Sequence, residues 1–276
     1  MRMPEEHADR EVVDLPVTSS GPPIIPEEQR SLFRQVLSHL EERRIEFAVA
    51  GAFALQEHTG IYRDTKDLDL FLTAENARLA LASLRADGFE CEICDPVWLF
   101  KVHRGNFFVD LITGMSNAAI VVDDSWIKRS KLATVHGIRT RVLGAEELLA
   151  SKLFVIRRER FDGADIAHIV YGTHGNLDWQ RIMQLVGEHW EVLLWALVLF
   201  HFVYPAHTAN VPRDVWEDLI GRFHDQVRSP NRMAKFRGSL VDDRMFAIDV
   251  NEWGMDDLLE VNRRRRLREI QEKQSA

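Results

Sequence analysis

Two carboxylates separated by one residue form the part of this chain best suited to chemistry. Asp67 and Asp69 lie in an otherwise apolar, strand-like run at residues 65–72. Because side chains alternate across a strand, both acids point to one face and the leucines beside them point to the other. Two like charges held together in a low-dielectric site are costly unless they share a proton or a cation lies between them. The pair therefore predicts a site for a hard divalent metal at a sheet edge.

A third acid, Asp110, is surrounded by apolar residues and therefore needs a buried partner. It lies in the second strand of a predicted hairpin, 98–103 and 106–112. If that strand lies beside the one carrying Asp67 and Asp69, the three acids form an oxygen-ligand set suited to Mg²⁺, which takes further ligands from substrate phosphates. In the alternative interpretation, Asp67 caps a turn, Asp69 forms a surface ion pair and Asp110 lies at a hairpin edge.

A glycine turn precedes the acids. Gly51 ends a short predicted strand at 47–50, and a predicted helix begins at Ala52. A helix that begins after a glycine offers free backbone N–H groups to an anion such as a nucleotide phosphate. Because one helix and one loop separate this turn from Asp67, a phosphate-binding turn and a metal site could face each other.

These residues resemble the nucleotidyltransferase superfamily related to DNA polymerase β. Its signature is a Gly-Gly or Gly-Ser turn, a helix, an Asp-x-Asp or Asp-x-Glu pair on a strand, and a later acid on a neighbouring strand. Gly51-Ala52 matches the turn, with Ala in place of the second Gly or Ser, and Asp67, Asp69 and Asp110 match the acids. The chain looks most like the AbiEii-type, toxin-related nucleotidyltransferases.

The resemblance, which spans roughly residues 45–170, implies a role for each matching position. Asp67 and Asp69 would hold the metal that bridges the triphosphate, and Asp110 would hold a second metal and help to deprotonate the attacking hydroxyl. Gly51 and Ala52 would offer backbone N–H groups to the phosphates. Further nucleotide-binding side chains would be Arg63, Thr65, Lys66, Lys152, Arg157 and Arg158.

Lys152 and Asp165 each allow two interpretations. Lys152 borders the apolar stripe of a predicted helix at 145–160, and the pattern alone favours a surface lysine with a solvated ammonium group. The resemblance implies instead that Lys152 reaches a phosphate. Asp165, in a predicted helix at 162–171, is expected to orient a basic residue and not to bind metal.

The function that follows from the resemblance is Mg²⁺-dependent transfer of an NMP from an NTP, ATP or GTP, to a hydroxyl acceptor. Mn²⁺ is a further metal candidate. RNA, protein and small-molecule acceptors remain open; tRNA is attractive because related toxins modify RNA, and a cognate antitoxin or other partner protein is expected. One alternative is an NTP-binding or interaction protein that has lost turnover, motivated by Ala52. Another is a structural domain whose acids pair with arginines such as Arg63.

Composition limits these choices. The net charge of −8 and pI near 5.8 argue against a protein that coats nucleic acid indiscriminately, but they permit a local basic groove. Two cysteines imply no disulfide framework, and the acidic, proline-containing N-terminus lacks the apolar core of a signal peptide, so a cytoplasmic location is expected. The longest apolar stretch, 192–203, is too short to span a bilayer and predicts a buried helix.

We expect an α/β (α+β) fold in which a mixed sheet flanked by helices precedes a mainly helical C-terminal half. The predicted parts are a disordered tail at 1–25, a nucleotidyltransferase domain at 26–143, a helical domain at 144–227, and an extension at 228–276 whose basic tail includes arginines 263–268. Further expected helices are 26–44, 75–87, 178–186, 191–204 and 212–223, and further strands are 138–142 and 245–250.

Overall fold

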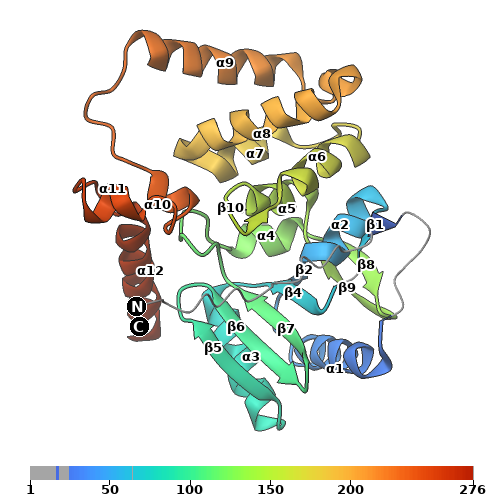
Figure 1. Cartoon of the computed structure of the whole chain (residues 1–276). Helices are drawn as coiled ribbons and strands as arrows, with labels where there is room; N and C mark the ends of the chain where they lie inside the picture. The colour runs from blue at the N-terminus through green and yellow to red at the C-terminus, as the bar shows by residue number, and fades with distance from the viewer. Residues whose placement is uncertain (1–16, 19–24, 64, 276) are drawn as a thin grey trace, which may run out of the picture.

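The computed structural model describes residues 17–18, 25–63 and 65–275. A seven-stranded mixed sheet forms the lower part of the molecule in Figure 1, and helices fill the upper part. From one edge to the other, the strands are β5 (Glu90–Asp95), β6 (Leu99–Arg104), β7 (Phe107–Ile112), β4 (Asp67–Phe71), β2 (Ala48–Val49), β9 (Ile138–Val142) and β8 (Lys131–Val135).

β4 and β7 lie at the centre of the sheet, and the alternation of their buried side chains explains why they are strands. They run parallel, with Leu68 opposite Val109 and Leu70 opposite Leu111. All four of these side chains are fully buried. Because alternate residues on each strand point into the same core, the residues between them must point to the opposite face. The sheet thus fixes the direction of every acid on these two strands.

Helices cover the sheet and link it to the C-terminal half. α1 (Glu27–Glu42) packs on β7 and β9, and α3 (Ala74–Ala86) packs on β5. α2 (Gly51–Thr59) packs on β4 and contacts α5 (Ala145–Lys152) and α6 (Gly163–Gly172). The helical half therefore rests on the helix that follows the glycine turn.

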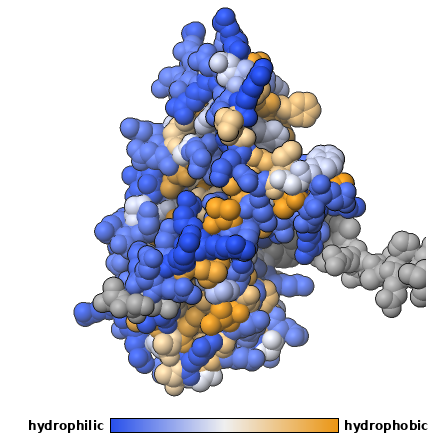
Figure 2. Space-filling view, turned by 90° about the vertical axis from the view of Figure 1, so that its left-hand side faces the viewer, coloured by the Kyte–Doolittle hydropathy of each residue, from blue (hydrophilic) through white to orange (hydrophobic). Residues whose placement is uncertain are grey.

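The remaining helices complete the C-terminal half. Helix α12, dark red in Figure 1, lies beside β5, so the end of the chain returns to the sheet. Figure 2 shows that the face carrying this end of the chain is mostly hydrophilic, with scattered apolar side chains. The remaining helical elements are α4 (Asp124–Arg129), α7 (Trp179–Val186), η1 (Gly187–His189), α8 (Trp190–Val203), η2 (Pro205–Asn210), α9 (Arg213–Arg228), α10 (Gly238–Val241), α11 (Ala247–Asn251) and α12 (Leu258–Ser275).

The predicted mixed sheet with flanking helices is confirmed, as are the hairpin of β6 and β7 and most of the helices. The helix predicted at 145–160 is wrong. α5 ends at Lys152, and the chain then forms a small hairpin of β10 (Ile156–Arg157) and β11 (Arg160–Phe161). Apolar residues continue at helical spacing from the buried end of α5 into this hairpin, so periodicity alone did not reveal that the helix ends at Lys152.

Three other segments bear on what was expected from the sequence. The strand predicted at 245–250 is wrong, because this segment forms a turn and α11. β5 was not predicted because it is an edge strand whose side chains are mostly exposed, so no apolar alternation marks it. Most of the predicted disordered tail lies outside the described residues; within it, β1 (Val17–Thr18) pairs antiparallel with β3 (Tyr62–Arg63).

Among the described residues, one stretch, Trp179–Val203, is long and apolar enough to cross a membrane by length and composition. It comprises α7, η1 and α8, and Gly187 at φ 51° separates the two α-helices. Each is shorter than the roughly 20 residues that a span requires. The predicted buried helix is only half buried, because Leu193, Leu197 and Phe200 face the core while Phe202 is 81% exposed.

Candidate active site

Strand pairing brings the three predicted acids together. One oxygen of each of Asp67, Asp69 and Asp110 lies within 4.8 Å of the others. Asp69 lies opposite Asp110 in the parallel β4–β7 register, so their side chains share a face, and Asp67 joins them from two residues earlier. Asp110 is not at a hairpin edge, because β7 lies between β6 and β4. Within the described part of the chain, Asp69 has no ion-pair partner.

The start of α2 lies directly against Asp69. The Ala50 N–H donates to the Asp69 carbonyl oxygen at 2.8 Å. Gly51 has φ 54°, and a Cβ added there would overlap Asp69 Oδ2. Glycine is therefore required both for the left-handed backbone and for the close approach. None of the described side chains caps α2, so its first N–H groups are available to an anion beside the three acids.

Burial and mutual repulsion make the acids hard to ionise together. Burial, and then the charges of Asp67 and Asp110, raise the pKa of Asp69 from 3.8 to about 7. Burial also raises the pKa of Asp110, although the hydrogen bond from Lys101 opposes this shift. The site thus holds more negative charge than its own neighbours balance, which is the condition that a bound cation relieves.

Lys101 is a site residue that the motif analysis missed. Its Nζ donates to Asp110 Oδ1 at 2.6 Å and lies 3.7 Å from the centre of the Phe108 ring. Lys101 is opposite Asp110 in the β6–β7 register. The hairpin was predicted, so counting residues across it would have identified this partner. Thr65 holds the first acid in a similar way, because its Oγ1 donates to Asp67 Oδ1 at 2.6 Å.

A group of paired charges lines the same cavity as the acids, and we call it the charge network. Lys152 Nζ lies 2.7 Å from Asp162 Oδ2 and 3.0 Å from Asp165 Oδ2. Arg160 makes two 3.1 Å contacts with the carboxylate of Asp162. Arg63 forms an ion pair with Asp165. Three cations and two carboxylates therefore lie together, with one positive charge in excess.

The charge network resolves two sequence interpretations. Lys152 is not a surface lysine, because it is only 9% exposed. Burial would lower its pKa, but Asp162 and Asp165 raise the pKa overall. Asp165 does hold basic residues, as expected. Arg63 pairs with it and not with the metal-site acids, contrary to the structural-domain interpretation.

Arg160 and Asp162 were not predicted as site residues. Arg160 lies in β11 of the hairpin that replaces the end of the expected helix, Asp162 directly follows it, and this hairpin returns the chain to the cavity. Burial would raise the pKa of Asp162, but Lys152 and Arg160 lower it overall. No motif marks these two positions, and only recognition of the turn after Lys152 would have brought them into view.

One cavity of about 650 Å³ contains both charge groups. The acids line it, and so do six of the eight predicted nucleotide-binding residues: Gly51, Ala52, Arg63, Thr65, Lys152 and Arg157. The other two do not. Lys66 is exposed outside the cavity, and the exposed Arg158 is fixed only through its backbone N–H, which donates to Asp242 Oδ2 at 3.0 Å.

The remaining wall of the cavity carries Trp98, Met115 and Ser116 and is supported by α12. Arg263 of α12 donates to the Ser116 carbonyl oxygen at 3.0 Å and pairs with Asp95 at 2.9 Å. Asp95 in turn accepts from Trp98 Nε1 at 3.1 Å. The basic C-terminal tail is therefore not a freely solvated charge run at this position, because one of its arginines buttresses the cavity wall.

A known protein family matches the part of the chain that carries this site. The family described as "Nucleotidyl transferase of unknown function (DUF2204)" matches residues 29–191, which include every residue of the acid cluster and of the charge network. No curated protein matches the chain. The expected membership of the nucleotidyltransferases is thus confirmed at the level of the superfamily.

Several solved structures are partly similar to this chain. The solution structure of the antibiotic-resistance factor ANT(2'')-Ia is 15% identical in sequence to this chain, with a TM-score of 0.42. The crystal structure of ANT(2'')-Ia with adenylyl-2''-tobramycin is also 15% identical, with a TM-score of 0.38. Each match covers 64% of this chain and 99% of the ANT(2'')-Ia chain. An antigenic nucleotidyltransferase-like protein from Paracoccidioides brasiliensis is 17% identical with a TM-score of 0.41, covering 68% of this chain and 95% of that chain. The family match covers more than half of this chain, so the chain belongs to the DUF2204 nucleotidyl transferases.

Proposed function

We propose that this protein transfers an NMP from an NTP, ATP or GTP, to a hydroxyl acceptor in a reaction that depends on Mg²⁺. The observation that carries the proposal is the cavity in which three clustered carboxylates face the uncapped N-terminus of α2. Acids alone would suit many metal sites. A helix N-terminus and an excess of cations beside them suit a triphosphate.

The acids fit a hard divalent metal. Their oxygens are clustered, their charges are poorly balanced, and oxygen donors are the ligands that Mg²⁺ prefers. In this proposal Asp67 and Asp69 would hold one metal ion and Asp110 would hold a second; Mn²⁺ would satisfy the same donors. When bound, such a metal neutralises charge on the phosphates and lowers the pKa of a coordinated hydroxyl.

The chain's own groups would position the nucleotide. Backbone N–H groups at Gly51 and Ala52 would contact the β- and γ-phosphates, because they open from the start of α2 into the cavity. Lys152 and Arg160 would add charge-assisted hydrogen bonds, since both are held at the cavity by Asp162. Thr65 and the cationic Arg63 and Arg157 complete the lining, whereas Lys66 and Arg158 lie outside it.

In the chemical step, the acceptor oxygen would form a bond to the α-phosphorus while the bond from that phosphorus to the bridging oxygen of pyrophosphate breaks. Pyrophosphate leaves with the electron pair, and Asp110 helps to remove the acceptor's proton. Lys101 keeps Asp110 in place through Oδ1. Catalysis of this type consists mainly of alignment and charge neutralisation.

Within the superfamily, we propose an AbiEii-type protein of the cytoplasm, related to toxin–antitoxin systems and paired with a cognate antitoxin or other partner. Among RNA, protein and small-molecule acceptors, we favour RNA, including tRNA. Trp98 offers an aromatic surface in the cavity that holds Asp110, and Arg157 lines the same cavity. We also propose that residues 26–143 form the catalytic domain, 144–227 a helical domain, and 228–276 an extension that returns to it.

The direct test is transfer of label from α-³²P NTPs to components of a cell extract in the presence of Mg²⁺. We expect one NTP to label an acceptor, and Asp67→Ala to lower the rate by about 10³-fold or more because the metal contributes several kcal/mol to the barrier. Asp124→Asn, an exposed acid of α4, is the matched control and should retain full activity.

Calorimetry separates the alternatives. Binding of NTP with Mg²⁺ but no labelled product from any NTP would replace our proposal with an NTP-binding protein that has lost turnover. Absence of both metal and nucleotide binding would leave a structural domain. Label transfer that Asp67→Ala does not change would remove the proposed role of the acids.

A further inference from the structure

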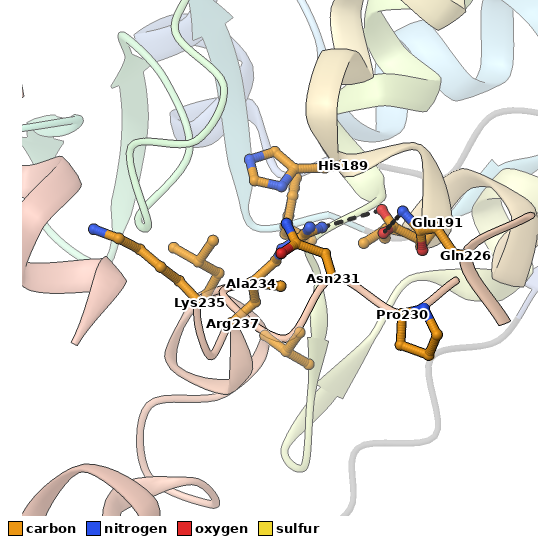
Figure 3. Close-up of a pocket in the computed structure, with 12 residues that line it drawn as sticks. His189, Glu191, Gln226, Pro230, Asn231, Ala234, Lys235 and Arg237 are labelled. Carbon is orange, nitrogen blue, oxygen red and sulfur yellow. Dashed lines mark hydrogen bonds and ion pairs between the residues drawn. The ribbon is translucent and has the colours of Figure 1, made fainter. Parts of the chain in front are cut away.

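A second cavity, of about 500 Å³, is drawn in Figure 3, and none of the three acids lines it. Its walls come from segments far apart in the sequence, namely Phe154 after α5, His189 of η1, the start of α8, the end of α9, the linker 229–237 and α10. We call it the Arg237 pocket. Its volume falls in the range of about 300–1,000 Å³ that is typical of small-molecule sites.

The pocket has an apolar part and a polar part. Phe154, Val192 and Leu240 line it with hydrocarbon. Figure 3 shows His189, Asn231 and Arg237 gathered around one region of the pocket, whereas the ammonium group of Lys235 points away from them. A ligand that fills this space must therefore bury an apolar body and present a polar group to these side chains.

Charge decides what that polar group is. The one carboxylate in the lining, Glu191, is already engaged, because Arg237 lies 3.1 Å from its Oε2 and Gln226 donates to its Oε1 at 3.4 Å. Arg237 is the cation left for a ligand, because the Lys235 ammonium group lies 4.0 Å from Asp256 and is engaged there. An anion would accept hydrogen bonds from the guanidinium group without displacing Glu191, since guanidinium offers five N–H donors.

His189 adds a polar group whose ring nitrogens make no described hydrogen bond. Its ring packs edge-on against Phe154, with centroids 5.2 Å apart and an interplanar angle of 89°. Burial lowers the pKa of His189, so the ring is mostly neutral near pH 7 and offers one donor and one acceptor. A neutral ring that packs on an aromatic wall suits a ligand with an apolar body.

Phe154 connects the pocket to the active-site cavity, because it lines both. It is 7% exposed and follows Lys152 of the charge network by two residues. The Val155 N–H donates to the Lys152 carbonyl oxygen at 3.0 Å, so this segment is tied back to α5. A ligand that moves Phe154 would therefore disturb the side of the active site where we place the phosphates.

We propose that the Arg237 pocket is a second ligand site, for a compact molecule with one anionic group on an apolar or aromatic body, and that its occupancy changes nucleotide affinity through Phe154. The binding part is independent of the proposed function, and the coupling part rests on it. Linkage requires that any such effect be reciprocal.

Phenyl phosphate, inorganic phosphate and phenol are the three probes that test the ligand class. The His189 ring signal in ¹H–¹³C NMR spectra, assigned by its loss in His189→Gln, reports the site. We expect saturable shifts with phenyl phosphate and at least tenfold weaker binding of phosphate or phenol alone. Equal binding of phosphate alone would overturn the required apolar body, and equal binding of phenol would overturn the required anion.

Two variants localise the binding. Arg237→Met should weaken phenyl phosphate at least tenfold, whereas Arg232→Met, an exposed arginine of the same linker, should not. Ala234→Trp fills the pocket without removing an ion pair and should abolish the shifts while leaving the melting temperature near that of the parent. Full binding by Arg237→Met or by folded Ala234→Trp would overturn the site.

The coupling is tested separately. Saturating phenyl phosphate should change the dissociation constant for NTP with Mg²⁺ at least about fivefold, and Ala234→Trp should remove that change. Binding in the Arg237 pocket without this change would overturn the coupling. Asp69→Asn should still bind phenyl phosphate there, so a failure of the active-site proposal remains distinguishable from a failure of this one.

Discussion

Asp69 and Asp162 line the same cavity, yet their surroundings shift their pKa values in opposite directions. Burial and two neighbouring acids raise the pKa of Asp69 to about 7. Burial alone would raise the pKa of Asp162 too, but Lys152 and Arg160 lower it. Burial is common to both acids, so the sign of the shift is decided by the charges nearby.

This difference separates the acid cluster from the charge network. Every carboxylate of the charge network has a basic partner inside the protein, so the network can hold its geometry without a ligand. Among the residues that the structure describes, the acid cluster has one such partner, Lys101, which pairs with Asp110. Unbalanced charge costs stability and is retained where a ligand supplies the missing charge, which is why the acid cluster is the better candidate for metal binding.

The largest effect should come from breaking the charge network, whose carboxylates all have basic partners. Lys152→Met leaves Asp162 and Asp165 buried with fewer cations, and we expect it to lower the free energy of unfolding by about 3–5 kcal/mol, as for a broken buried ion pair. Denaturant unfolding followed by circular dichroism measures this change. Lys131→Met, an exposed lysine of β8, is the control and should change stability little. An equally small effect at Lys152 would show that the network does not hold the fold.

For the acid cluster, we expect a substitution to change the free energy of unfolding in the opposite direction. Without metal, Asp69→Asn should raise the free energy of unfolding at pH 8 by about 1–3 kcal/mol, a value reduced from the full pKa shift because Asp69 is partly exposed. The folded pKa of about 7 exceeds the unfolded value of 3.8, so the charge penalty develops as pH rises from about 4 to 7. The gain should therefore be small at pH 4.

Denaturant unfolding at both pH values, with and without Mg²⁺, checks this prediction. Saturating Mg²⁺ should reverse the ranking at pH 8, because the metal stabilises the parent protein and not the variant. The matched variant is Asp162→Asn, which should destabilise the protein at the same pH since its charge is balanced. If Asp69→Asn and Asp162→Asn have effects of the same sign, the contrast between the two groups is wrong.

The sequence predicted the acid cluster better than the charge network for a physical reason. Asp67, Asp69 and Asp110 lie on strands whose side chains alternate, so strand pairing alone brings them together. The charge network depends on the hairpin after Lys152, where Arg160 and Asp162 return to the cavity. That return depends on tertiary packing, which residue spacing does not encode.

A similar distinction holds for the fold. The mixed sheet, its β6–β7 hairpin and most helices follow from apolar periodicity and turn residues. The edge strand β5 and the helix α11 lack a buried face with a clear period, so the pattern could not identify them. Arg263 shows the same limit for function, because its contact with Asp95 joins residues 168 positions apart.

The smallest effect should come from the contact between Gly51 and Asp69. Gly51→Ala and Gly60→Ala both place a side chain at positive φ, which costs roughly 1–2 kcal/mol. Only at Gly51 would the new Cβ overlap a carboxylate, since nothing lies near a Cβ at Gly60. We expect Gly51→Ala to lose about 1 kcal/mol more than Gly60→Ala in denaturant unfolding.

The added loss should disappear when the carboxylate is removed. In the Gly51→Ala/Asp69→Ala double variant, compared with Asp69→Ala alone, the alanine at position 51 should cost only the backbone strain seen at Gly60. This result would show that the glycine is required by the acid beside it as well as by its own backbone angle. An unchanged cost in the double variant would mean that the turn before α2 is set by φ alone, and that the acid cluster places no demand on it.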